Sequence, residues 1–190
     1  MKVLEVELVG TSTLGFGRKG ESEKKEAGET EDTFALRTYR EKCHVTEDGE
    51  VFLNPIGLKK AVETACSRIG ESVPGKGKSQ WTKFVRSGIS CNEPILLGVN
   101  VKDVSYAKVY VPSNGMVGGG KRVWRYFPTL AKWSGKARIE IIDESIPVDK
   151  MKEWLAYAGQ YCGVGVFRPS SQSGGWWGRF KVKSIKEVKI

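Results

Sequence analysis

The segment of residues 51–69, VFLNPIGLKKAVETACSRI, contains the strand-to-helix transition that decides the expected fold. Its first three residues are β-branched, aromatic and aliphatic, and they predict a strand. Asn54 then matches a helix N-cap and Pro55 the first helical position, because asparagine accepts from free backbone N–H groups and proline has none to satisfy. Apolar residues recur at helical spacing to about position 69, where Gly70 follows. The segment therefore predicts an amphipathic helix packed on a sheet.

Strands are expected on both sides of this helix. Residues 3–9 alternate in the manner of a strand with one buried face. Residues 34–45 are compatible with a strand or a short helix, and the strand is favoured. A second helix is expected from Pro147 to about Gly159. Further strands are expected at residues 94–99, 108–112, 123–128, 137–142 and 177–185.

This order of elements predicts an α+β fold of ferredoxin-like kind, with two helices on one face of a mostly antiparallel sheet. A length of 190 residues suits a single domain over residues 1–190. The segment from about 71 to 132 is longer than such a core needs. We expect it to be a basic insertion that projects from the sheet.

The composition favours a polyanionic partner. Lysine and arginine number 31 against 22 acidic residues, which gives a net charge of +9. No stretch approaches the ~20 apolar residues of a membrane span, and the first ten residues lack the apolar run of a signal peptide. The four cysteines lie far apart in the sequence. We therefore expect a cytoplasmic protein with reduced, mostly buried thiols, no membrane contact, no metal site and no cofactor.

The positive charge is concentrated in three segments that also contain aromatic residues, whereas acidic residues are concentrated in residues 21–32, which are expected to form a solvated loop. Cations that hold phosphates and flat side chains that stack on bases are what single-stranded nucleic acid requires. The alternative is that the aromatics are core residues of strands whose other face is solvated. On the first interpretation, the phosphates would contact Lys76, Lys78, Lys83, Lys121, Arg122, Arg125, Arg168 and Arg179, and bases would stack on some of Trp81, Trp124, Trp176 and Trp177.

Several chemical motifs are incomplete. Residues 15–20 match the glycine spacing of a dinucleotide-binding loop, but no amphipathic helix follows them. Residues 115–121 match a phosphate-binding loop, but the position that should bind magnesium is Arg122, and a strand follows. His44 is the only histidine and is expected to be structural. Glu31 and Asp32 are the candidates for metal-dependent acid–base chemistry, with a solvated loop as the alternative.

Three segments together resemble the CRISPR-associated RAMP (repeat-associated mysterious protein) superfamily. Residues 51–61 are similar to its strand-to-helix element, and residues 14–17 to the glycine turn after its first strand. Residues 158–180, with GVGVFRP and GGWWGRF, resemble its glycine-rich loop. The resemblance implies a modified RRM-like fold with a thumb-like insertion, and single-stranded RNA held by a backbone subunit. It also implies phosphate contacts for Lys59, Lys60, Arg168 and Arg179, and it places Asp32 in a region where some such subunits carry a catalytic acid.

The sequence is compatible with three functions. The first is a non-enzymatic protein of antiviral defence that binds single-stranded nucleic acid, with RNA favoured over DNA, and that could assemble side by side along the strand. The second is a metal-dependent ribonuclease that uses Asp32 or Glu31. The third is a protein-docking module or inhibitor that engages CRISPR-type subunits because it resembles them. A stand-alone or virus-encoded relative of backbone subunits is as compatible with the sequence as a member of a full complex.

Overall fold

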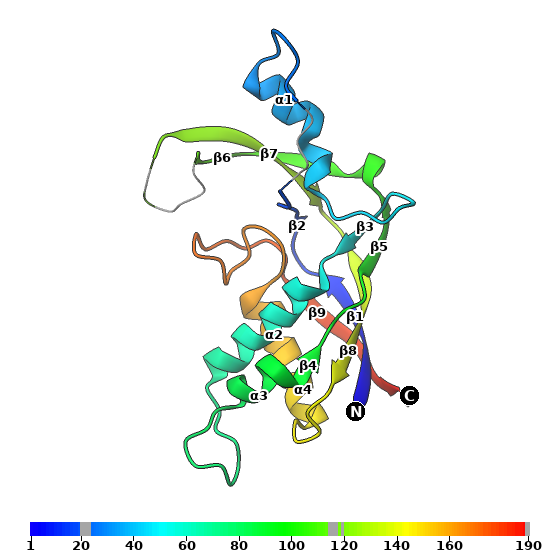
Figure 1. Cartoon of the computed structure of the whole chain (residues 1–190), viewed down its shortest axis with the longest axis vertical. Helices are drawn as coiled ribbons and strands as arrows, with labels where there is room; N and C mark the ends of the chain where they lie inside the picture. The colour runs from blue at the N-terminus through cyan, green and yellow to red at the C-terminus, as the bar shows by residue number, and fades with distance from the viewer. Residues whose placement is uncertain (20–23, 114–117, 119, 189–190) are drawn as a thin grey trace.

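Strand β1 (Lys2–Gly10) lies inside the main sheet because alternate side chains give it one fully apolar face. The computed structural model describes residues 1–19, 24–113, 118 and 120–188. Within these residues the main sheet is antiparallel, with the order β4 (Ile89–Ser90), β8 (Ser134–Ile141), β1, β9 (Phe180–Val188). Figure 1 shows the two long strands that flank β1 in this sheet. The expected α+β class with antiparallel sheets is confirmed.

Two helices pack on one face of the main sheet (Figure 1). Helix α2 (Pro55–Ile69) buries Leu58, Val62 and Ala65, and helix α4 (Val148–Tyr157) buries Met151, Trp154 and Leu155. These side chains join the apolar face of β1 in one hydrophobic core. A π-helical turn, Ala158–Cys162, extends α4. In the described part of the chain, no helix combines the length and apolar character needed to cross a membrane.

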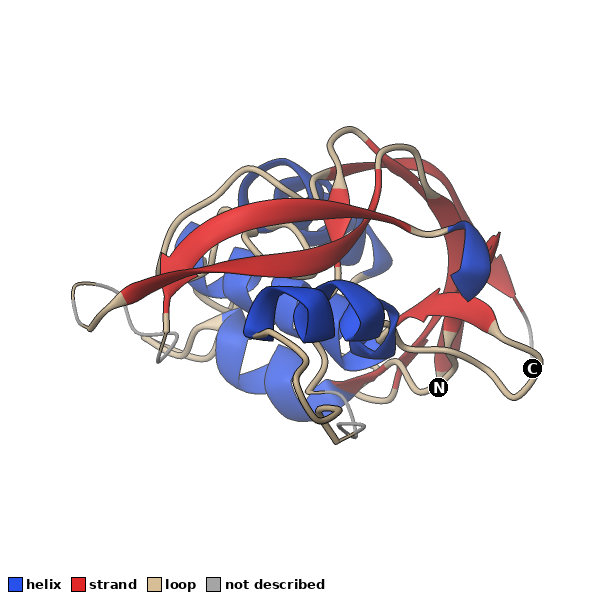
Figure 2. Ribbon diagram, turned by 90° about the horizontal axis from the view of Figure 1, so that it is seen from above, coloured by secondary structure: helices blue, strands red, loops and turns tan. Residues whose placement is uncertain are grey.

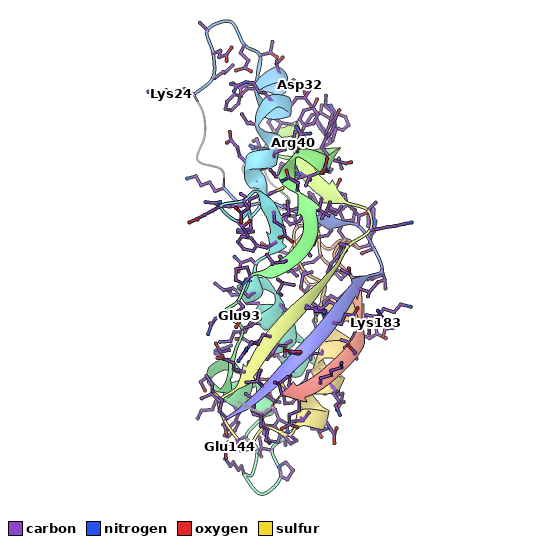
Figure 3. All side chains as sticks on the ribbon, turned by 90° about the vertical axis from the view of Figure 1, so that its right-hand side faces the viewer. Lys24, Asp32, Arg40, Glu93, Glu144 and Lys183 are labelled. Atoms are coloured by element: carbon purple, nitrogen blue, oxygen red, sulfur yellow. The ribbon has the colours of Figure 1, made fainter. Side chains whose placement is uncertain are left out.

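The other face of the main sheet is charged and solvated. Glu7 Oε1 lies 2.9 Å from Lys183 Nζ, and Lys136 is the partner of Glu7 on the neighbouring strand. Glu5 has Arg138 as its partner there. Figure 3 shows Lys183 on this face. Part of the basic excess near the C-terminus is therefore balanced by the acids of β1.

A long β-hairpin projects from the body of the protein (Figures 1 and 2). It consists of β6 (Ser105–Pro112) and β7 (Arg122–Leu130), and β7 also pairs with the short strand β2 (Leu14–Gly15). The register places Val109 opposite Arg125 and Tyr110 opposite Trp124. One face, here called the inner face, therefore carries Val109, Val111, Arg125 and Phe127; the outer face carries Lys108, Tyr110, Trp124 and Tyr126.

Much of the segment expected to project as an insertion packs into the fold instead. Helix α3 (Trp81–Gly88) contacts α2 and buries Val85 in the core, and β4 joins the main sheet. Strand β5 (Ile95–Asn100) pairs with β3 (Glu50–Leu53). The two long strands of the hairpin extend away from the helices and the main sheet (Figure 2).

The favoured strand over residues 34–45 is wrong. This region forms helix α1 (Glu31–Thr38) followed by a 3₁₀ turn, Tyr39–Lys42. The Thr30 side chain caps the helix, because its oxygen accepts from the backbone N–H of Thr33 at 3.1 Å. Glu31 and Asp32 lie in the first turn, where negative charge is favourable. Residues 21–23 of the expected acidic loop lie outside the described residues.

All four cysteines are buried and free, as expected. Burial raises the pKa of Cys43 to about 12 and the pKa values of Cys66 and Cys91 to about 11. These thiols stay protonated at neutral pH and act as small apolar core residues.

Candidate nucleic-acid interface

The two glycine segments noticed at opposite ends of the sequence lie side by side. The backbone N–H of Val166 donates to the Gly15 carbonyl at 3.0 Å, and the N–H of Gly178 donates to the Thr13 carbonyl at 2.7 Å. Residues 163–178, here called the glycine-rich loop, therefore pack on the glycine turn after β1. In Figure 1 this loop (orange) lies between the hairpin and the start of α2. Three adjoining clefts open along this junction.

The first cleft, here called the α2 cleft, lies at the N-terminus of α2 and measures about 320 Å³. Asn54 caps the helix there, since its Oδ1 accepts from the Ile56 N–H at 2.9 Å. Arg18 from the glycine turn, Lys60 from α2 and Arg168 from the glycine-rich loop line the same cleft. A helix N-terminus with three cations around it is an arrangement that attracts anions such as phosphate.

Gly57 lies in the first turn of α2 and also lines this cleft. Glycine in a helix costs about 1 kcal/mol relative to alanine. A Cβ at this position would have no protein atom within 4 Å, so packing within the described chain does not explain the glycine. The missing side chain leaves the helix N-terminus open to the close approach of a ligand backbone.

His44 also lines the α2 cleft, and its ring lies 5.5 Å from the ring of Phe52. Burial lowers the pKa of His44, and the charge of Arg18 lowers it further. The imidazole is therefore neutral at pH 7 and offers one hydrogen-bond donor and one acceptor to a ligand. Sequence reasoning gave His44 a purely structural role and did not place it in a cleft.

The second cleft, here called the central cleft, separates the inner face of the hairpin from the glycine-rich loop. It measures about 730 Å³ and shares Gly17, Val166 and Arg168 with the α2 cleft. Lys19 and Arg125 add two further cations. Arg125 is held by donation from Nη2 to the Ser113 carbonyl at 2.9 Å. The central cleft thus extends the basic surface from the helix terminus to the hairpin.

The third cleft, here called the tryptophan pocket, measures about 420 Å³. It lies between strand β6 and the part of the glycine-rich loop that carries Trp176 and Trp177, and Arg122 lines it as well. It shares residues with the central cleft, so the three clefts form one continuous basic groove. The described cations lining this groove are Arg18, Lys19, Lys60, Arg122, Arg125 and Arg168, and none of its described lining residues is acidic.

The structure brings about half of the expected binding residues to this groove. They come from α2, from β7 and from the glycine-rich loop, which are far apart in sequence. They are Lys60, Arg122, Arg125, Arg168, Trp176 and Trp177.

Trp81 is not available for base stacking, which corrects the expectation from the sequence. Its side chain is only 4% exposed. Its ring lies 6.0 Å from the rings of both Trp154 and Phe84. The first turn of α3 points Trp81 into the core, and the flanking lysines remain at the surface, so here the alternative of a core aromatic beside solvated cations is the correct one.

The basic residues around α3 form a separate surface. Lys78, Lys83 and Arg86 line a cleft that shares no residue with the groove. Lys76 Nζ lies 4.4 Å from the ring centroid of Phe84. Lys59 Nζ donates to the Arg86 carbonyl at 3.1 Å and lies 3.7 Å from Glu63. Local packing therefore accounts for Lys59 and Lys76 without a ligand.

Three further expected residues lie outside the groove lining. Trp124 is 56% exposed, but on the outer face of the hairpin, with its ring 5.1 Å from that of Tyr110. Lys121 is exposed beside the hairpin end, where its carbonyl accepts from the Ser113 N–H. The Arg179 side chain is exposed just after the glycine-rich loop, and its backbone N–H donates to Ser12 Oγ at 2.9 Å.

Asp32 links α1 to the outer face of the hairpin. Its Oδ1 lies 3.0 Å from Lys108 Nζ, and its Oδ2 accepts from the Tyr126 hydroxyl at 3.0 Å. These bonds, chiefly the one from Lys108, lower the pKa of Asp32. Figure 3 shows Asp32 near the end of the molecule remote from Glu144. Among the described residues, no three of the histidine, cysteine, aspartate and glutamate side chains gather in a way that could hold a metal ion.

Replacing Asp32 by alanine is expected to loosen α1 from the hairpin, because it removes the bonds to Lys108 and Tyr126. Amides of α1 and β7 should exchange faster with solvent, while those of α2 keep their protection. Glu31→Ala is the matched control, because Glu31 pairs with Lys25 at 2.8 Å and, among the described residues, forms no bond to the hairpin. RNA incubated with Mg²⁺ should stay intact with all three proteins; cleavage by the unmodified protein that Asp32→Ala abolishes would assign Asp32 to catalysis.

Sequence reasoning missed Arg18 and Lys19 as groove residues. Both directly follow the glycine turn of residues 15–17, which resembles the RAMP superfamily, so their position was a usable signal. It also did not bring together Phe127 and Phe167, whose rings pack edge to face 4.9 Å apart in the wall of the central cleft. No spacing rule connects two residues that meet through different sheets and loops.

The fold and the groove together define an α+β protein with two helices on an antiparallel sheet, a projecting hairpin and a basic cleft system. Among solved structures, the chain is similar to one in the structure of the Type III-B Cmr-beta bound to cognate target RNA, with 14% identity and a TM-score of 0.55. The match covers 99% of this chain and 61% of that one, so this chain spans less than two thirds of its length.

A second similar structure is Cmr6 from Pyrococcus furiosus, with 10% identity, a TM-score of 0.47, and coverage of 96% of this chain and 98% of that one. No protein-family model and no curated protein matches the sequence. At these identities the likeness is one of fold. The likeness agrees with the ferredoxin-like α+β architecture expected from the sequence.

Proposed function

We propose that this protein binds single-stranded nucleic acid in the basic groove, with RNA preferred over DNA, as a non-enzymatic relative of CRISPR RAMP subunits. The observation that carries the proposal is the convergence of six cations, a helix N-terminus and several aromatic rings on one continuous groove with no acidic side chain among its described lining residues. The RNA-bound state of the similar Type III-B Cmr-beta structure supports the choice of RNA.

The parts of the groove have different tasks under this proposal. The α2 cleft holds phosphates, because Arg18, Lys60 and Arg168 surround a helix N-terminus there. The central cleft continues the backbone contact through Lys19 and Arg125. Aromatic side chains beside these cations provide surfaces for bases, the usual combination for single strands.

The proposal includes assembly along the strand. The hairpin projects beyond the helices (Figure 2), so the part of its outer face that α1 does not cover can contact a neighbouring copy or another CRISPR-type subunit bound to the same RNA. Such partners would be held together by the shared strand. The proposal also implies a role in antiviral defence in the cytoplasm.

Titration of the protein with single-stranded RNA and DNA of equal length, followed by tryptophan fluorescence and mobility shift, tests the proposal. Binding should weaken steeply with salt, with a slope of log K against log salt of about −2 or steeper if at least three phosphates are neutralised. RNA should bind more tightly than DNA. Equal affinity at 0.05 and 0.5 M salt would contradict the proposal; absence of binding together with co-purification of CRISPR-type subunits would favour protein docking.

A further inference from the structure

We infer that the tryptophan pocket binds one unstacked nucleobase of the strand whose phosphates lie in the groove. The inference rests on the proposed function and deepens it, because it names the chemical group that this part of the groove takes. The pocket measures about 420 Å³, which is within the range of sites for small organic molecules.

The walls of the pocket suit a planar, partly apolar group. Val109 and Val111 line it from the hairpin, and Phe167, Trp176 and Trp177 line it from the glycine-rich loop. Trp176 is 69% exposed. An indole ring held at a cleft wall with most of its surface uncovered gains from stacking, and nucleobases offer a flat face for it.

The aromatic base of the pocket is built before any ligand arrives. The ring of Phe167 lies 4.9 Å from that of Phe127 and 5.1 Å from that of Trp177, both edge to face. Phe167 has a φ of +52°, a left-handed conformation that a phenylalanine rarely adopts. The backbone N–H of Trp177 donates to the Phe167 carbonyl at 3.1 Å. Gly175 packs so closely that a Cβ would overlap this carbonyl. A pocket fixed in this way loses little entropy on binding.

The surroundings identify the group as part of a nucleic acid. Arg122 lines the pocket, and only one of its donors has a partner among the described residues, the Tyr110 carbonyl at 3.0 Å from Nη2. The remaining guanidinium donors can hold a phosphate beside the base. The pocket also shares Val111, Pro112, Phe167 and Ser173 with the central cleft, which contains Arg125. A strand in the central cleft can therefore place its next base in the pocket.

The test compares Trp176→Leu with the control Trp124→Leu. Both side chains are exposed, so neither change should unfold the protein, but Trp124 lines none of the three clefts. With the shortest RNA that binds fully, Trp176→Leu should weaken binding about 5- to 100-fold, the worth of one stacked base. Trp124→Leu should change it less than twofold, and Trp176→Phe should retain most of the affinity.

A second readout separates base binding from phosphate binding. The same RNA is made with one base removed at each position in turn. At one position, removing the base should weaken binding to the unmodified protein. At that position the same removal should not further weaken binding to Trp176→Leu. The salt slope of RNA binding should be the same for Trp176→Leu and the unmodified protein. Salt-dependent binding that is insensitive to Trp176 and to every missing base would overturn the base pocket and leave the groove intact. No binding of any RNA by the unmodified protein would overturn both.

Discussion

Replacing Arg18, Lys60 and Arg168 together by glutamine is expected to weaken RNA binding about 100-fold at 0.1 M salt. These three side chains line the α2 cleft from three different elements. On the counterion-release scale for single strands, each phosphate contact contributes about 0.7 to the salt slope, or about fivefold in affinity at 0.1 M salt. Three contacts therefore give about 100-fold. The salt slope should fall by about 2, measured by fluorescence titration from 0.05 to 0.5 M salt.

The matched control replaces Lys78, Lys83 and Arg86 by glutamine. This change also removes three positive charges, but from a separate cleft, so it reproduces any effect of net charge alone. We expect a loss below fivefold and a nearly unchanged slope. If the two triple variants lose affinity equally, the net positive charge of the protein attracts the nucleic acid and the groove is not its specific binding site. If the control loses more, the interface lies along α3, as the sequence alone suggested for Lys78 and Lys83.

Replacing Gly178 by alanine is expected to destabilise the protein by about 3 kcal/mol or more. Gly178 has a φ of +69°, which costs an L-residue about 1–2 kcal/mol. A Cβ would also overlap the carbonyl oxygen of Val164, a residue whose backbone N–H donates to the Gly178 carbonyl at 3.0 Å. Overpacking of this kind adds about 1–3 kcal/mol. Urea denaturation would measure the change.

Gly174→Ala is the control for backbone conformation alone. Gly174 lies in the same loop with a φ of +58°, but a Cβ there meets nothing within 4 Å. Its substitution should cost only about 1–2 kcal/mol. Equal losses for the two variants would mean that the contact between Gly178 and Val164 does not hold the glycine-rich loop in place.

The sheet and its two helices could be predicted because local patterns determine them. Alternation in residues 3–9 selects one buried face, and Asn54 with Pro55 starts α2 where the sequence places it. The same kind of local signal exists for α1: Thr30 is a favourable N-cap, followed by two acids. The favoured strand over residues 34–45 does not take this cap into account, and α1 forms there instead.

The site could be predicted only in part, because linear clusters of cations and aromatics look alike whether they are buried or exposed. Trp81 and Trp176 both lie in basic or glycine-rich surroundings, yet one is in the core and the other at a cleft wall. Trp81 is buried because α3 packs against α2, and this tertiary contact cannot be read from the local sequence. Of the four cations that the resemblance to RAMP proteins implied, Lys60 and Arg168 line the α2 cleft, whereas Lys59 and Arg179 lie outside the groove.

The pairing of the glycine turn with the glycine-rich loop sets the order in which the protein becomes functional during synthesis. Strand β1 is synthesised well before both of its partners, β8 and β9, which lie more than a hundred residues later. The same holds for the bonds from Val166 and Gly178 to Gly15 and Thr13. Such long-range contacts form only when the late segments are available. A nascent chain that lacks these late segments therefore has no groove, and the proposed RNA binding can begin only after the glycine-rich loop and β9 have joined the fold.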